Sequence, residues 1–203
     1  MRTLLSAVLL TLGGVSLVGG QTPADTTVRR AAGAYVNVSF VGITAFGWST
    51  ARDIGSLQRG DHDPQVRGVS IPNAELALDG TVDPYFKGYT YIVHKLDANG
   101  ETGIELEEMF FLTTSLPGNL QVKGGQFFAE FGRQNPQHPH SWAFADQPLV
   151  LNRMFGPDGL RSQGLRLSWL APTSWYTEAM VAVANSAGTT ASSFLTSLPI
   201  GMD

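Results

Sequence analysis

Between residues 69 and 185, stretches of alternating apolar and polar side chains are separated in turn by short and long connections. The short connections contain proline and fall at residues 83–84, 116–119 and 171–174. The long ones are polar and cover residues 97–101 and 134–162. Short turns at one end of the strands and long loops at the other are typical of outer-membrane β-barrels. The pattern therefore predicts an all-β chain, folded as an antiparallel up-and-down transmembrane β-barrel.

The alternation within each stretch has the period of a β-strand. In AYVNVSFVGITAFGW, from residue 34 to 48, β-branched and aromatic residues dominate, as is usual for strands. After the N-terminal apolar run, no stretch keeps the helical period of 3.6 residues for more than about two turns. Residues 34–185 therefore form the predicted barrel region, interrupted by the long loop 134–162. Its predicted strands cover residues 34–48, 69–82, 85–95, 102–115, 120–133, 163–170 and 175–184.

The first 20 residues have the three parts of a secretory signal peptide. Arg2 supplies the positive charge, residues 4–18 form the apolar centre, and small residues precede Gln21. The apolar run of about 15 residues is shorter than the roughly 20 that a membrane-spanning helix needs. We therefore expect residues 1–20 to be removed on export and residues 21–33 to be a flexible segment. The expected destination is the bacterial outer membrane.

The composition narrows the classes of function. The chain has no cysteine, which excludes disulfides, thiol nucleophiles and thiolate metal sites. Its 13 basic and 17 acidic residues are nearly balanced and form no basic cluster, so nucleic acid is not an expected partner. A mean hydropathy of +0.01 and the 23 glycines suit a barrel wall, in which every second side chain faces lipid.

The strand predicted at residues 102–115 carries several acidic side chains. Strict alternation gives it two faces, one with Glu105, Glu107, Met109 and Phe111 and the other with Ile104, Leu106, Glu108, Phe110 and Leu112. Glu105 and Glu107 would lie about 7 Å apart, a spacing that also occurs in glycoside hydrolases. Acidic rows that face a lumen, however, are an ordinary way to favour cations in a pore. No Ser-His-Asp motif or phosphate-binding glycine loop accompanies them, so an enzyme is not expected.

Aromatic residues gather near the predicted short turns. Such residues form belts at the two membrane–water interfaces of membrane proteins. The residues concerned are Tyr85, Phe86, Tyr89, Trp169, Trp175 and Tyr176.

About half of the chain carries recognisable motifs. They are AELAL at residues 74–78, VDPYF at 82–86, IELEEMFFLTT at 104–114, LPGNLQVKGGQFF at 116–128, NPQHPHSWAF at 135–144, DQPL at 146–149 and LRLSWLAP at 165–172. Through them the chain resembles a bacterial outer-membrane porin-like β-barrel family, often labelled zinc-regulated or TonB-dependent outer-membrane receptors. The resemblance implies an outer-membrane barrel that is larger than this chain can build.

The chain departs from that family at both ends. A TonB-dependent receptor has a plug domain before a barrel of about 22 strands, whereas only residues 21–33 separate the signal peptide from the first predicted strand. At the other end, residues 186–203 lose the alternating pattern. We expect the chain to be the N-terminal part of a larger barrel. The alternative is that residues 190–200 form an eighth strand and close a small barrel.

The long loop contains the best candidate ligands. His138 and His140 would point the same way in an extended chain and could share Zn²⁺ with Asp146. The preferred interpretation is structural, with the loop folded into the lumen to narrow it. Trp142 and Arg153 belong to this candidate constriction. The isolated His62 and His94 are expected to be solvated.

The leading hypothesis is an outer-membrane channel for passive diffusion of small polar or cationic solutes. The alternatives are a receptor-like barrel for a metal or metal complex, and a soluble exported β-sandwich with a binding or structural role. The expected partners are outer-membrane lipid and small solutes, and a homo-oligomer is left open. No cofactor is expected apart from the candidate zinc.

Overall fold

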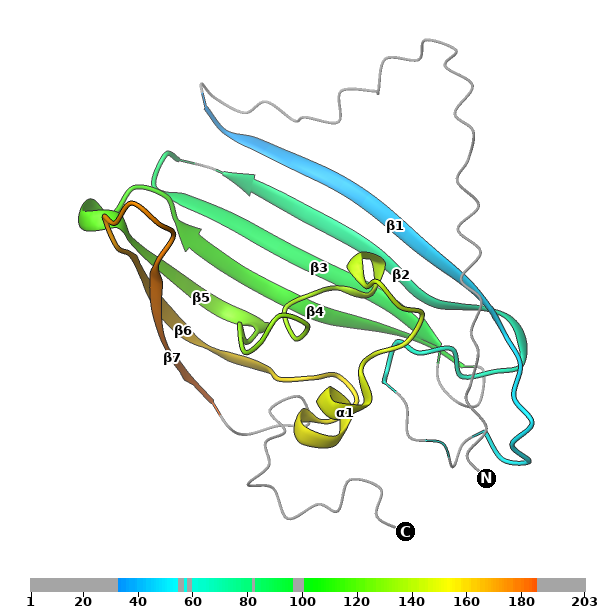
Figure 1. Cartoon of the computed structure of the whole chain (residues 1–203). Coiled ribbons are helices and arrows are strands. Elements are labelled where there is room, and N and C mark those ends of the chain that lie inside the picture. The colour runs from blue at the N-terminus through cyan, green and yellow to red at the C-terminus, as the bar shows by residue number, and fades with distance from the viewer. Residues whose placement is uncertain (1–32, 55–56, 58–59, 82, 97–100, 186–203) are drawn as a thin grey trace.

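The computed structural model describes residues 33–54, 57, 60–81, 83–96 and 101–185. The predicted signal peptide, the flexible segment up to residue 32 and the stretch 186–203 lie outside the described residues. The described chain is an all-β antiparallel sheet with up-and-down topology, in which each strand pairs with its neighbours in sequence (Figure 1). The strands are β1 (Tyr35–Gly47), β2 (Gly68–Thr81), β3 (Phe86–Leu96), β4 (Thr102–Thr113), β5 (Leu120–Phe128), β6 (Arg161–Leu170) and β7 (Glu178–Ala184).

All seven predicted strands are confirmed, and most bounds agree within two residues. β5 ends earlier than predicted, at Phe128, because the chain turns away from the sheet after Ala129. β7 begins later, at Glu178, because the Thr173 hydroxyl donates a hydrogen bond to the carbonyl of Trp175 and holds these residues in the turn.

The predicted alternation in length holds for two of the long connections, residues 48–67 and 129–160, but residues 97–101 between β3 and β4 are fewer than those in the β4–β5 and β6–β7 turns. The turns β2–β3, β4–β5 and β6–β7 are short, and the second contains the 3₁₀ helix η1 (Pro117–Asn119). The β5–β6 connection, residues 129–160, contains the 3₁₀ helix η2 (Pro139–Ser141) and the helix α1 (Leu149–Phe155). Among the described residues, no helix is both long and apolar enough to cross a membrane.

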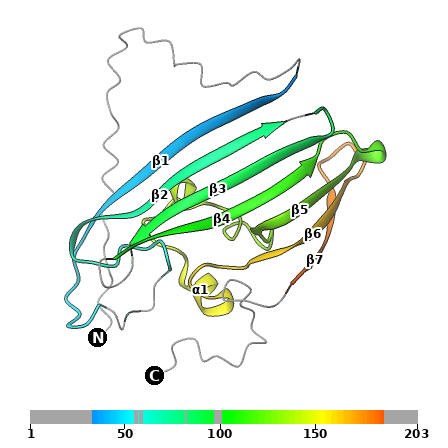
Figure 2. The ribbon, with the colours of Figure 1, turned by 180° about the vertical axis from the view of Figure 1, so that it is seen from behind.

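Residues 129–160, here called the β5–β6 segment, lie against one face of the sheet (Figure 1). We call this the inner face. Seen from behind, the strands lie in front of this segment, so the other described elements leave the outer face uncovered (Figure 2). The β5–β6 segment brings His138 and His140 to Glu75 on the inner face.

Buried side chains of the described residues are mostly polar. The buried apolar ones are few: Ala45, Val93, Phe127, Phe128 and Phe155. The buried charged ones include Glu75, Glu107, Glu108, Lys123, Arg161 and Arg166. The inner face is thus a polar interior, in contrast to the apolar core of an ordinary soluble domain.

One glycine permits the close pairing of β4 and β5. Gly125 has a φ of 134°, and a Cβ on it would lie 2.2 Å from the carbonyl oxygen of Met109. Because no L side chain fits there without moving the backbone, a glycine at position 125 is a structural requirement of the sheet.

Candidate functional site

A β-bulge brings two adjacent glutamates to the inner face. β3 pairs Ile92 with Leu106 but Tyr91 with Glu108, so Glu107 is the extra residue of β4. A bulge of this kind reverses the alternation beyond it. Glu107 and Glu108 are therefore both buried, 1% and 5% exposed, although they are neighbours in sequence.

The bulge corrects the predicted faces of this strand. Glu105 and Glu107 share the inner face as predicted, but Met109 and Phe111 do not, since they are 56% and 40% exposed on the outer face. Glu108 lies on the inner face, where its carboxylate accepts a hydrogen bond of 2.8 Å from the backbone N–H of Phe128. A period-two pattern cannot include an extra residue, which is why strict alternation assigned Glu108 to the other face.

His138 reaches the three buried carboxylates of the inner face from the β5–β6 segment. Its Nδ1 lies 2.9 Å from Glu75 Oε2 and 3.0 Å from Glu107 Oε2, and its Nε2 lies 2.8 Å from Glu108 Oε2. The Tyr91 ring lies beside the imidazole at 4.6 Å between centroids. We call Glu75, Glu107, Glu108 and His138 the carboxylate–histidine cluster.

The charge state of His138 follows from these contacts. Burial alone would lower the pKa of His138, but the nearby carboxylates of Glu107, Glu108 and Glu75 outweigh burial and raise the pKa to about 12. At neutral pH the side chain is an imidazolium that partly neutralises three buried carboxylates.

The side-chain amide of Asn135 joins the two ends of the β5–β6 segment by hydrogen bonds. Asn135 donates hydrogen bonds of 2.7 Å and 2.9 Å to the carbonyls of Ala129 and Leu160, and it accepts one of 2.8 Å from the Leu160 N–H. Asp63, from the β1–β2 connection, accepts a 2.7 Å hydrogen bond from the Gln147 N–H. These contacts hold the segment against the sheet and so position His138.

A second network lies beside the cluster. Arg161, 1% exposed, contacts the carboxylates of Glu105 and Asp158, and its Nη1 donates a 3.2 Å hydrogen bond to the Glu107 carbonyl. Lys95 contacts both Glu105 and Asp61. We call this the Arg161 network.

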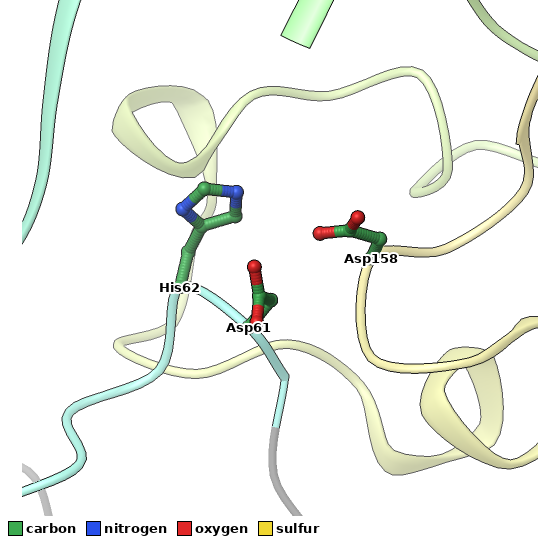
Figure 3. Close-up of side chains that lie close together, drawn as sticks. All are labelled: Asp61, His62 and Asp158. Carbon is green, nitrogen blue, oxygen red and sulfur yellow. The ribbon is translucent and has the colours of Figure 1, made fainter. Parts of the chain in front are cut away.

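His62 joins the two groups, and the expectation that it is solvated is wrong. It is 8% exposed and its Nε2 lies 3.1 Å from Glu107 Oε1. Burial would lower its pKa, but the Glu107 carboxylate raises it. Figure 3 shows His62 beside Asp61 and Asp158. The physical reason is that the β1–β2 connection folds back onto the inner face.

Asp158 provides a pH-dependent term in stability. Burial, with repulsion from Asp61, raises the pKa of Asp158 from 3.8 to about 6, despite the attraction of Arg161. The pKa of Asp158 in the folded chain lies above its value in the unfolded chain. The contribution of Asp158 to the free energy of unfolding is therefore fully present below about pH 4 and is lost as the pH rises through 6.

Replacing Asp158 by asparagine should remove this term. We expect the free energy of unfolding of Asp158→Asn, relative to the original chain, to rise by on the order of 2 kcal/mol between pH 4 and pH 8. Urea unfolding in detergent, followed by tryptophan fluorescence at several pH values, measures this. Parallel pH curves for the two chains would contradict the assignment.

The other predicted site residues lie around the cluster. His140 Nδ1 is 3.5 Å from Glu75 Oε2, and the His140 side chain is 35% exposed. The Trp142 indole donates a 2.8 Å hydrogen bond to the Gln137 carbonyl. Asp146 is exposed and belongs to neither group of ligand side chains within reach of one ion. His138 and His140 thus meet Glu75 and Glu107, in place of the Asp146 partner proposed from sequence.

Arg153 lies in the last turn of α1 and is exposed. Sequence reasoning missed Glu75, Glu108 and Arg161. Glu75 had a usable signal, since alternation in β2 places it on the same face as Asp79. Arg161 had none, because it lies at the edge of a long loop.

Comparisons with known proteins give one relative. An uncharacterized protein of Aquifex aeolicus (strain VF5) is 44% identical over 112 residues, which are 55% of this chain and 23% of the relative. The match thus spans less than a quarter of that protein. No family model matches the chain. No solved structure matches it.

Proposed function

We propose that this chain forms part of the wall of an outer-membrane β-barrel channel, through which small polar or cationic solutes diffuse. The β5–β6 segment narrows the lumen of this channel. The resemblance noted in the sequence is consistent with such a barrel.

The distribution of polarity across the sheet carries the proposal. Exposed large apolar side chains occupy the outer face, whereas the buried inner face holds carboxylates, lysine and arginine. A water-filled barrel in lipid has this arrangement, with apolar residues outward and polar residues inward along each strand. The exposed outer residues include Val36, Val38, Phe40, Ile71, Ile104, Leu106, Met109, Leu165, Leu167, Val181 and Val183.

Aromatic residues at the short-turn end provide further support. Tyr85, Trp175 and Tyr176 are 62%, 69% and 78% exposed there. Exposed amphipathic rings at the end of an apolar band suit the headgroup level of a bilayer. Of the predicted belt, Tyr89 is the exception, because it packs on Phe110 at 4.9 Å between ring centroids.

The described sheet has two open edges. β1 pairs only with β2, and β7 pairs only with β6, among the described residues. A β-structure in lipid must be closed so that no backbone hydrogen-bonding groups remain unpaired. The proposed barrel therefore needs strands beyond the described ones. A soluble sandwich would instead need a second sheet over the apolar outer face, and the described residues form a single sheet.

The β5–β6 segment accounts for selectivity in the proposal. It lies across the inner face (Figure 1), and Glu75, Glu107 and Glu108 surround its His138 side chain. Acidic groups in a constriction favour cations over anions.

The direct test is conductance of the complete barrel that contains this chain, extracted from the outer membrane of a Gram-negative host and inserted into planar bilayers. We expect greater permeability to K⁺ than to Cl⁻. A variant in which residues 137–153 are replaced by a short Gly-Ser linker should conduct severalfold more, because the constriction is removed. Recovery of the chain as a soluble periplasmic protein without detergent would overturn the proposal. Unchanged conductance after the replacement of residues 137–153 would show that the β5–β6 segment does not narrow the lumen.

A further inference from the structure

We propose that Glu75, Glu107 and His138, assisted by His140, bind a divalent transition-metal ion of the zinc type, which fastens the β5–β6 segment to the sheet. The inference concerns ion binding on the inner face and does not depend on the proposed channel.

The ligand atoms already converge. One oxygen or nitrogen from each of Glu75, Glu107 and His138 lies within 4.8 Å of the others. Glu75 Oε2 is 2.9 Å from His138 Nδ1 and 3.5 Å from His140 Nδ1. Zinc–ligand bonds of about 2.1 Å in a tetrahedron place neighbouring ligand atoms about 3.4 Å apart. Small side-chain shifts therefore suffice to form the site.

The balance of charge favours a cation at this point. Glu75, Glu107 and Glu108 are 2%, 1% and 5% exposed. Among the described residues, these three carboxylates form ion pairs with His62, His138 and His140. A divalent cation between the carboxylates would compensate their buried negative charge, which is unfavourable without compensation.

Glu107 provides an independent observation. Both of its carboxylate oxygens are buried, yet neither makes a hydrogen bond in the structure. They lie 3.1 Å from His62 Nε2 and 3.0 Å from His138 Nδ1, but outside hydrogen-bond geometry. Buried polar atoms without a hydrogen-bond partner call for an explanation, and a bound ion is one such explanation.

An ion can reach the cluster from solvent. A cavity of about 500 Å³ separates the β5–β6 segment from the β1 side of the sheet, and His62 and His140 line it. His140 is 35% exposed, so it lies between the cavity and the buried Glu75.

The choice of metal follows from the ligand types. Imidazole nitrogen with carboxylate oxygen suits zinc and its neighbours, whereas Ca²⁺ and Mg²⁺ prefer oxygen ligands alone. The neighbouring group of Asp61, His62 and Asp158 (Figure 3) is a weaker candidate. Lys95 and Arg161 already neutralise its two carboxylates.

The test is titration of the full chain in detergent micelles, freed of metal by EDTA, with Zn²⁺ at pH 7.5 by calorimetry. We expect one ion per chain, with a proton released from His138. Glu75→Gln and His138→Ala should each weaken binding at least 100-fold, as expected for the loss of one ligand, whereas Asp146→Asn on the same segment should change it less than twofold.

Co²⁺ provides a second readout that needs no variant. Its visible absorption bands report nitrogen and oxygen ligands in a tetrahedral site, and Zn²⁺ should displace it. Zn²⁺ should also slow tryptic cleavage within residues 133–153, because the segment becomes fixed. If His138→Ala does not fold, the affinity of the isosteric Glu75→Gln and the Co²⁺ spectrum of the original chain together show whether the ion binds at the proposed ligands. The absence of saturable binding to the folded chain, or equal affinity in Glu75→Gln, overturns the proposal.

Discussion

Placing two arginines on the outer face, with Phe40→Arg and Leu165→Arg, should abolish insertion of the chain into lipid. Phe40 is near the middle of β1 and 71% exposed, and Leu165 is near the middle of β6 and 58% exposed. An arginine at the bilayer midplane costs a barrel about 2–4 kcal/mol, so the pair should cost about 4–8 kcal/mol. In water the same changes at exposed positions would be nearly neutral.

Insertion is measured by flotation with liposomes and by heat-modifiable mobility in gels. The matched control is Phe144→Arg with Val150→Arg, which makes the same kind of change at exposed apolar positions of the β5–β6 segment, 67% and 59% exposed. The control should insert normally. If the first variant instead folds in buffer without detergent, the outer face does not contact lipid and the channel proposal is wrong.

Removal of the Arg161 side chain should have the second-largest effect. Arg161→Ala removes the guanidinium that Glu105 and Asp158 share. It also removes the hydrogen bond that Arg161 donates to the Glu107 carbonyl. Loss of one partner from a buried ion pair costs about 3–5 kcal/mol, since the remaining charge stays buried. Urea unfolding in detergent should show this loss in the free energy of unfolding.

Arg133→Ala is the matched control, because Arg133 is an exposed arginine of the adjoining β5–β6 segment. It should change the free energy of unfolding by less than about 0.5 kcal/mol. The double variant Arg161→Met with Glu105→Gln should recover part of the loss, since it removes charge on both sides. An Arg161→Ala chain as stable as the Arg133→Ala chain would mean that the network contributes nothing.

The strand order and the turns could be predicted because each depends on local sequence. Period-two alternation located all seven strands, and proline located the short turns. The bulge at Glu107 could not be predicted, since a bulge depends on which residue of the neighbouring strand aligns with it. The sequence Glu107-Glu108 is compatible with either register, and only the pairing of Tyr91 and Ile92 decides between them.

The candidate site was predicted in part. The sequence singled out His138 and His140 as candidate ligands in the long loop, and both lie beside Glu75 in the structure. The partners of this pair were not predicted, because they come from β2 and β4, which are distant in sequence and close only across the folded sheet. Asp146 was attractive because it is near in sequence, and sequence proximity is a poor guide within a loop that folds back on a sheet.

The side-chain amide of Asn135 determines how the β5–β6 segment is attached to the sheet. By joining the carbonyls of Ala129 and Leu160, it ties the two ends of the β5–β6 segment together at the point where the strands stop. The segment is therefore attached to the sheet at a fixed place, and strand pairing does not constrain the sequence between its two ends. Substitutions within the segment should therefore change the chemistry of the inner face while the sheet that carries it stays the same.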